Sequence, residues 1–144
     1  MENYNQFVDI LNSELKPAMG CTEPIAIAYC ASIVKEVLGG LPTDVKVHVS
    51  GNIIKNVKSV KVPNTNGRIG IKVAAAIGIL AGDSAKELEV IADVTNDKIT
   101  QIDTYVKNIT VSPIDNDHTL YIEIIGKKAD GTIVKTVVGS VVES

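Results

Sequence analysis

A cysteine stands directly before a predicted helix start, and this placement gives Cys21 the clearest chemical potential in the chain. Thr22 is a favourable N-cap residue, and Glu23 and Pro24 suit a first helical turn. The free N–H groups and the dipole of a helix N-terminus favour an anion, so a thiolate forms more easily there. Cys21 is therefore a candidate nucleophile or metal ligand. Glu23 suits ligand binding or proton transfer as well as a helix start, and Thr22 is first an N-cap and second a ligand contact.

A second polar group follows a predicted strand. Asn52, Lys55 and Asn56 stand between two apolar segments that we expect to be strands. Lys55 can bind a carboxylate as a point charge and the two amides can orient it, so the three are candidate substrate-binding residues. Turn chemistry with a solvated lysine is the alternative interpretation. The loop 64–67 can also wrap a ligand, although Asn-Thr-Asn-Gly is an ordinary turn sequence.

The remaining cysteine and the two histidines suggest no further site. Cys30 lies nine residues after Cys21, and most of the residues between them are predicted to be helical, so about 100° per residue turns the two thiols to nearly opposite sides. We therefore interpret Cys30 as a small buried hydrophobic residue rather than a disulfide partner. His48 and His118 are far apart in the sequence and have no neighbouring ligands, so a zinc site is not expected.

Four segments carry a resemblance to a known enzyme family. They are residues 14–28, 50–56 and 60–67 and the Ala-rich run 73–82. In this order they resemble the N-terminal part of the L-cysteine desulfidase and alpha-type L-serine dehydratase family of iron–sulfur lyases, and the similarity covers residues 8–94. The resemblance implies a lyase of amino-acid catabolism that acts on L-cysteine or L-serine without PLP and releases pyruvate and ammonia.

The same resemblance implies a role for Cys21 as a ligand of a 4Fe–4S cluster. A cluster needs about three or four thiolates, and this chain has two cysteines. The family likeness therefore implies an N-terminal domain or subunit, inactive alone, that joins the remainder of the lyase or a second cysteine-bearing subunit in an oligomer. Gly51 stands where that family commonly has proline, and Val57 where glycine is common. The alternative is a non-catalytic stand-alone module, for small-molecule binding or assembly, derived from that family.

Composition limits the class of protein. The 144 residues are 45% hydrophobic but only 3% aromatic, so the core must consist of Ile, Val, Leu and Ala. A net charge of −3 with scattered Lys and Arg argues against nucleic acid as a partner. No apolar stretch reaches the ~18 residues of a membrane span, and the first residues lack signal-peptide features. We therefore expect a cytoplasmic protein with reduced thiols. A small amino acid as ligand is implied by the family resemblance.

Periodicity predicts a single α+β domain over residues 1–144, with buried Ala-rich helices packed on a small sheet and a C-terminal part rich in β-hairpins. Helices are predicted at 4–16, 23–38, 71–80, 85–92 and 99–106. Strands are predicted at 45–50, 57–62, 109–111, 120–125 and 132–138, with a hairpin turn at 129–131.

Overall fold

The structure is a computed structural model, and it describes residues 5–11, 23–114 and 121–139. Within these residues a five-stranded mixed sheet has the strand order β1-β5-β4-β2-β3. The strands are β1 (Asn5–Leu11), β2 (Asp44–Ser50), β3 (Ile109–Ile114), β4 (Tyr121–Lys127) and β5 (Ile133–Gly139). The helices are α1 (Glu23–Leu38), α2 (Gly51–Val57), α3 (Ile71–Ala81) and α4 (Asn96–Tyr105), with the 3₁₀ segments η3 (Ser84–Glu89) and η4 (Val106–Asn108).

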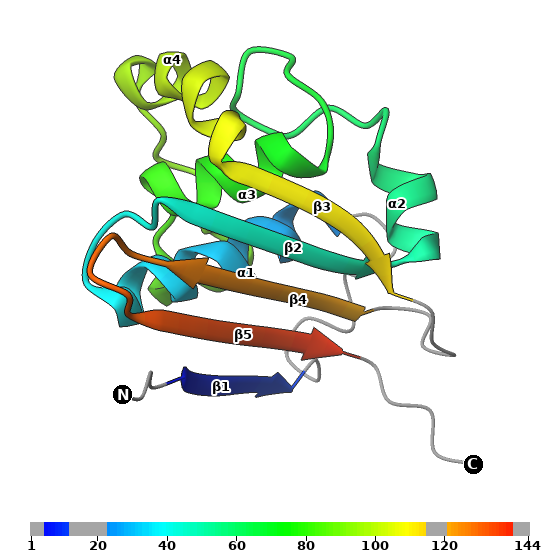
Figure 1. The fold of residues 1–144 in the computed structure, drawn as a ribbon. Helices are drawn as coiled ribbons and strands as arrows, with labels where there is room; N and C mark the ends of the chain where they lie inside the picture. Colours follow the sequence, from blue (N-terminus) through cyan, green and yellow to red (C-terminus); the bar gives the residue numbers. More distant parts are fainter. Residues whose placement is uncertain (1–4, 12–22, 115–120, 140–144) are drawn as a thin grey trace.

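The helices cover one face of the sheet (Figure 1). α1 and α3 lie behind the strands, and α4 packs on α3. Strand side chains that face these helices are buried and aliphatic, as period-2 alternation requires. They include Val45, Val47, Val49, Ile122 and Ile124. The other face carries the alternate side chains of β2 and β4, and no helix of the described residues lies over it. The predicted α+β class is confirmed.

Small residues let α1 and α3 approach backbone to backbone. Gly78 of α3 faces Ala28 of α1, and a Cβ added at Gly78 would lie 2.2 Å from the Ala28 carbonyl oxygen. The preceding turn of α3, residues 74–76, consists of fully buried alanines. The predicted Ala-rich helix is confirmed, and Gly78 is the residue that permits its close contact with α1.

The C-terminal strands form the predicted hairpin. β4 and β5 pair antiparallel, and the amide of Lys128 donates to the carbonyl of Thr132 at 2.9 Å to close the turn. Gly131 takes a φ of 93°, a region that favours glycine. β2 pairs antiparallel with β4 and parallel with β3, so the carboxyl ends of β2 and β3 lie side by side.

Three predicted elements are wrong. Within the helix predicted over 4–16, the described residues 5–11 instead form strand β1, which pairs in parallel with β5. The strand predicted over 57–62 is instead the end of α2 and a turn, with one isolated bridge between Lys61 and Ile69. The helix predicted over 85–92 is reduced to the 3₁₀ segment η3, where the amide of Asp83 donates to the carbonyl of Val90 and folds the segment back.

These errors share a physical cause. Short apolar runs suit a helix and a strand almost equally, and tertiary pairing decides between the two. The edge of β5 selects a strand for β1, whereas burial of Ile53 and Val57 selects a helix for α2. None of the helices in the described ranges is long and apolar enough to cross a membrane.

Candidate functional site

The predicted carboxylate-binding residues share one face of α2. Asn52, Lys55 and Asn56 are exposed and stand at i, i+3 and i+4, so they are neighbours on the helix surface. Ile53 and Val57 on the opposite side are buried and hold the helix to the molecule. The expectation that the three polar residues lie between two strands is wrong, but the structure does bring them together.

The position of α2 is set by the sheet. The helix starts directly after β2, at the end of the molecule where the carboxyl ends of the parallel strands β2 and β3 meet (Figure 1). Ile54 of α2 and Lys58, which directly follows the helix, contribute to a pocket of about 350 Å³. Ile54, Lys58, Ile71 and Lys72 line this pocket, so it is apolar with two cationic groups at its border.

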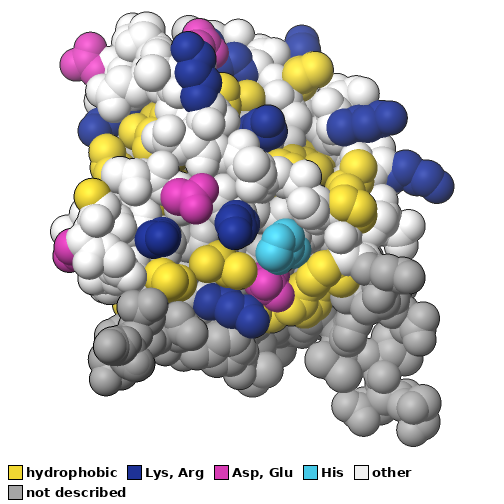
Figure 2. Space-filling model, viewed as in Figure 1, with side chains coloured by type: hydrophobic (Ala, Val, Ile, Leu, Met, Phe, Trp, Pro, Cys, Tyr) yellow, Lys and Arg dark blue, Asp and Glu magenta, His cyan; other side chains and the backbone are white. Residues whose placement is uncertain are grey.

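The sequence segment that contains α2 carries Lys and Arg but no acidic residue. Residues 45–82 contain no Asp or Glu, although the whole chain has a net charge of −3. The Lys and Arg residues in this acid-free segment are Lys46, Lys55, Lys58, Lys61, Arg68 and Lys72. In Figure 2 the dark-blue side chains at the right-hand edge, where α2 lies, have no magenta neighbour. The side chains of Asn52, Lys55 and Asn56 have no hydrogen-bond or ion-pair partner in the described part of the chain. An anion is the ligand that such a surface favours.

The structure does not describe the side chains of the proposed metal ligand and of two proposed substrate contacts. Cys21 and Thr22 lie outside the described residues. Glu23 is the first residue of α1, which begins where the capping pattern predicted, and its side chain is also outside the description.

Cys30 is a buried and free thiol, as the sequence predicted. It is fully inaccessible on α1, and its Sγ donates to the carbonyl of Thr136 at 3.6 Å. Burial raises the pKa of Cys30 strongly, and a backbone hydrogen bond involving Ile124 offsets this only in part. The thiol is therefore protonated at neutral pH and suited neither to nucleophilic attack nor to metal binding.

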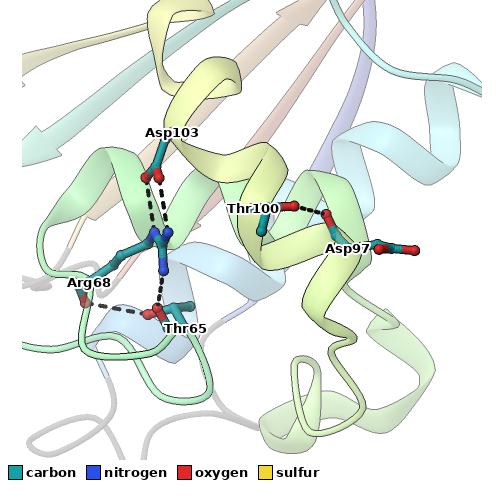
Figure 3. A network of polar contacts seen from close by, with 5 residues as sticks. All are labelled: Thr65, Arg68, Asp97, Thr100 and Asp103. Atoms are coloured by element: carbon teal, nitrogen blue, oxygen red, sulfur yellow. Dashed lines mark hydrogen bonds and ion pairs between the residues drawn. The ribbon is translucent and has the colours of Figure 1, made fainter.

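The loop 64–67 uses its polar groups internally (Figure 3). The hydroxyl of Thr65 donates to the carbonyl of Val62 at 2.7 Å, and the amide of Asn64 donates to the carbonyl of Ile91 at 2.9 Å. Arg68 donates through Nε and Nη2 to the two carboxylate oxygens of Asp103 on α4, each at 2.9 Å, and through Nη1 to the carbonyl of Thr65. These contacts fix the loop against α4, so turn chemistry explains it without a ligand.

A polar network on the open face of the sheet was not expected from the sequence. Glu123 on β4 is only 8% exposed, and three side chains converge on its carboxylate. Nδ1 of His48 lies 3.1 Å from Oε2, the hydroxyl of Tyr121 donates to Oε1 at 2.8 Å, and Nζ of Lys135 lies 3.9 Å from Oε1. Figure 2 looks onto this face, where cyan, magenta and dark-blue side chains lie together.

The network keeps its carboxylate ionised. Burial raises the pKa of Glu123, but the hydrogen bonds from His48 and Tyr121 and the charge of Lys135 outweigh it, so the pKa lies below the ordinary value. The alternation of Tyr121, Glu123 and Ile125 with buried isoleucines was the available sequence signal, because it places the glutamate on the outer face of a strand. His48, Tyr121 and Lys135 all contact the Glu123 carboxylate, so this network supports the sheet rather than offering an open site.

Known proteins that this chain resembles in sequence share one name, UPF0597 protein. The chain is 46% identical over 126 residues to a UPF0597 protein of Treponema denticola and 56% identical over 108 residues to a UPF0597 protein of Desulfitobacterium hafniense. It is 49% identical over 129 residues to a UPF0597 protein of Finegoldia magna. These matches cover 86%, 75% and 88% of this chain but 29%, 25% and 30% of the relatives. The chain thus spans about a quarter to a third of the length of the curated relatives it matches. No family model matches the sequence.

These findings correct the assignment to L-cysteine desulfidase and L-serine dehydratase lyases. The relatives are UPF0597 proteins, a name that states no lyase activity and no iron–sulfur cluster. Among the residues that the structure describes, no group of three or more His, Cys, Asp or Glu side chains could hold a metal ion. With Cys30 buried and protonated, the described residues do not fit a 4Fe–4S cluster. Similarity to UPF0597 proteins replaces the lyase assignment.

Proposed function

We propose that this chain is a small-molecule-binding module that holds a small amino acid on the outer face of α2. The observation that carries the proposal is that Asn52, Lys55 and Asn56 share one face of α2 and have no side-chain partner among the described residues, in a segment, 45–82, that contains no Asp or Glu. Lys55 supplies the positive charge for the ligand carboxylate. The amide oxygens of the two asparagines accept hydrogen bonds from the ligand ammonium, so both charged ends of the amino acid find partners.

A pocket that α2 lines in part supports a ligand of small size. Its volume of about 350 Å³ is at the lower end of the usual range for small-ligand sites, and α2 contributes Ile54 to its lining, whereas Asn52, Lys55 and Asn56 do not line it. Its apolar lining by Ile54 and Ile71 accepts a short side chain, whereas Lys58 and Lys72 at its border disfavour a cationic one. The proposal is therefore for a small neutral or acidic amino acid, with L-serine as the probe.

The contrast with the loop 64–67 supports this choice of site. The side chains of Asn64 and Thr65 are already bonded to the protein, whereas those on the α2 face have no partner among the described residues. Binding at α2 therefore breaks no hydrogen bond that the described residues make.

Ligand-observed saturation-transfer NMR with L-serine tests the proposal. A hydrogen bond to a charged group contributes about 1.5–3 kcal/mol, so Lys55→Gln should weaken binding by roughly 10- to 100-fold. Lys61→Gln is the matched control, because Lys61 belongs to the same acid-free segment but lies outside α2 and the pocket. Equal binding by both variants and the unmodified chain would reject the site. Acetate and ethanolamine, tested alone, separate the carboxylate and ammonium contributions.

A further inference from the structure

A second pocket lies far along the chain from α2, between α4 and the loop that follows α1. Its volume is about 500 Å³, within the usual range for small-ligand sites. Leu80 of α3 and Tyr105 of α4 are buried and form part of its apolar lining. Leu41 stands at the pocket with 50% of its surface exposed, the highest value among the exposed large hydrophobic residues in the described ranges.

The pocket has a stable and uncharged floor. The hydroxyl of Tyr105 donates to the carbonyl of Pro42, which ties the end of α4 to the loop that carries Leu41. Burial raises the pKa of Tyr105 to about 12, so the phenol stays neutral at physiological pH. The wall next to Leu41 is therefore held in place before any ligand arrives.

The border of the pocket is polar and carries one charge. Gln101, Lys107 and Asn108 line it, and their side chains have no partner within the described residues. No Asp or Glu is found among the described residues that line it, so Lys107 is its sole charged group. An apolar floor with one cation at the rim matches a ligand that has an apolar body and one negative charge.

We infer that this pocket binds an apolar monocarboxylate, with the hydrocarbon part covering Leu41 and Leu80 and the carboxylate at Lys107. The amides of Gln101 and Asn108 donate to the remaining carboxylate lone pairs. This inference is independent of the site on α2, because the two pockets share no lining residue.

Titration of the isotope-labelled chain with sodium octanoate tests the inference. Saturable shifts of the backbone amides of Gln101, Thr104 and Lys107, with smaller effects from the neutral isostere octanamide, are the expected result. Lys107→Gln should weaken octanoate binding by about tenfold, as loss of one charge-assisted hydrogen bond predicts. Lys98→Gln is the control, because Lys98 lies on α4, the helix directly before η4, and does not line the pocket.

A second variant separates the apolar contribution. Leu41 is half exposed, so Leu41→Ser should leave the fold intact while it weakens octanoate binding. Val37→Ser, at another exposed apolar position, should leave the affinity unchanged. Shifts that do not saturate, or equal affinities of the Lys107→Gln variant and the unmodified chain, would overturn the inference. L-serine binding at α2 is measured separately, so failure of one site leaves the other unaffected.

Discussion

Nδ1 of His48 lies 3.1 Å from Oε2 of Glu123, although the two residues are 75 positions apart in the sequence. They face each other because β2 and β4 pair in a register that sets His48 directly opposite Glu123. Tyr121 and Lys135 complete the shell around the carboxylate. One ionised glutamate thus links three neighbouring strands, β2, β4 and β5, on the face of the sheet that no described helix covers.

This network predicts an acid-sensitive component of stability. Because the pKa of Glu123 is lower in the fold than its ordinary value of 4.5, its contribution is present above that pH and is lost as the pH falls through the folded-state pKa. Glu123→Gln should lower the free energy of unfolding at pH 7 by about 1–2 kcal/mol, since hydrogen bonds to a charged acceptor are replaced by weaker ones.

Urea unfolding of the unmodified chain and of Glu123→Gln at a series of pH values measures this effect. The two curves should differ most above pH 4.5 and converge in stronger acid. Other carboxyls, such as Asp103 and Asp130, also have lowered pKa values, so the difference between the two proteins is the informative quantity. A difference that stays constant from neutral pH to strong acid would show that the Glu123 charge has no stabilising role.

The contact between α1 and α3 predicts a severe effect of one methyl group. Gly78→Ala would place a Cβ 2.2 Å from the Ala28 carbonyl oxygen, so the two helices must move apart. We expect a loss of about 3 kcal/mol in the free energy of unfolding, at the upper end of ordinary overpacking. Gly51→Ala is the control, because no atom lies within 4 Å of its added Cβ. Near-equal stability of both variants in urea would contradict this close packing.

The burial of Cys30 predicts that its thiol is alkylated slowly in the native protein. The raised pKa and complete inaccessibility of the thiol should protect it from iodoacetamide in the native protein at pH 8, and unfolding in urea should expose it. Mass spectrometry of the peptide that contains Cys30 measures the modified fraction in each state. Rapid labelling under native conditions would show that α1 does not pack on the sheet as described.

The strongest periodic segments could be predicted from the sequence. The run at 23–38 has capping residues and an apolar surface, and both bounds of α1 agree with the prediction. The alternation of valines with polar residues in β2 and the Ala-Asp-Gly turn before β5 were equally clear. Residues 5–11 were not, because only the edge of β5, more than a hundred residues away, selects a strand there.

The candidate sites were only partly predictable for a related reason. Asn52, Lys55 and Asn56 were identified by residue type, but their shared helical face required the structure of α2. His48 was dismissed because it has no ligand near it in the sequence, and its partner Glu123 became visible only with the strand register. Register depends on the packing of whole strands, so a single sequence does not specify which side chains meet across a sheet.

We propose above that the polar face of α2 binds a small amino acid. Protein NMR with L-serine tests it most directly, because the side-chain amides of Asn52 and Asn56 and the ammonium of Lys55 can be observed individually. We predict that all three resonances shift on addition of L-serine and saturate together with one dissociation constant. If these resonances stay unchanged while L-serine reaches high millimolar concentration, the claim is wrong and α2 is only a surface helix.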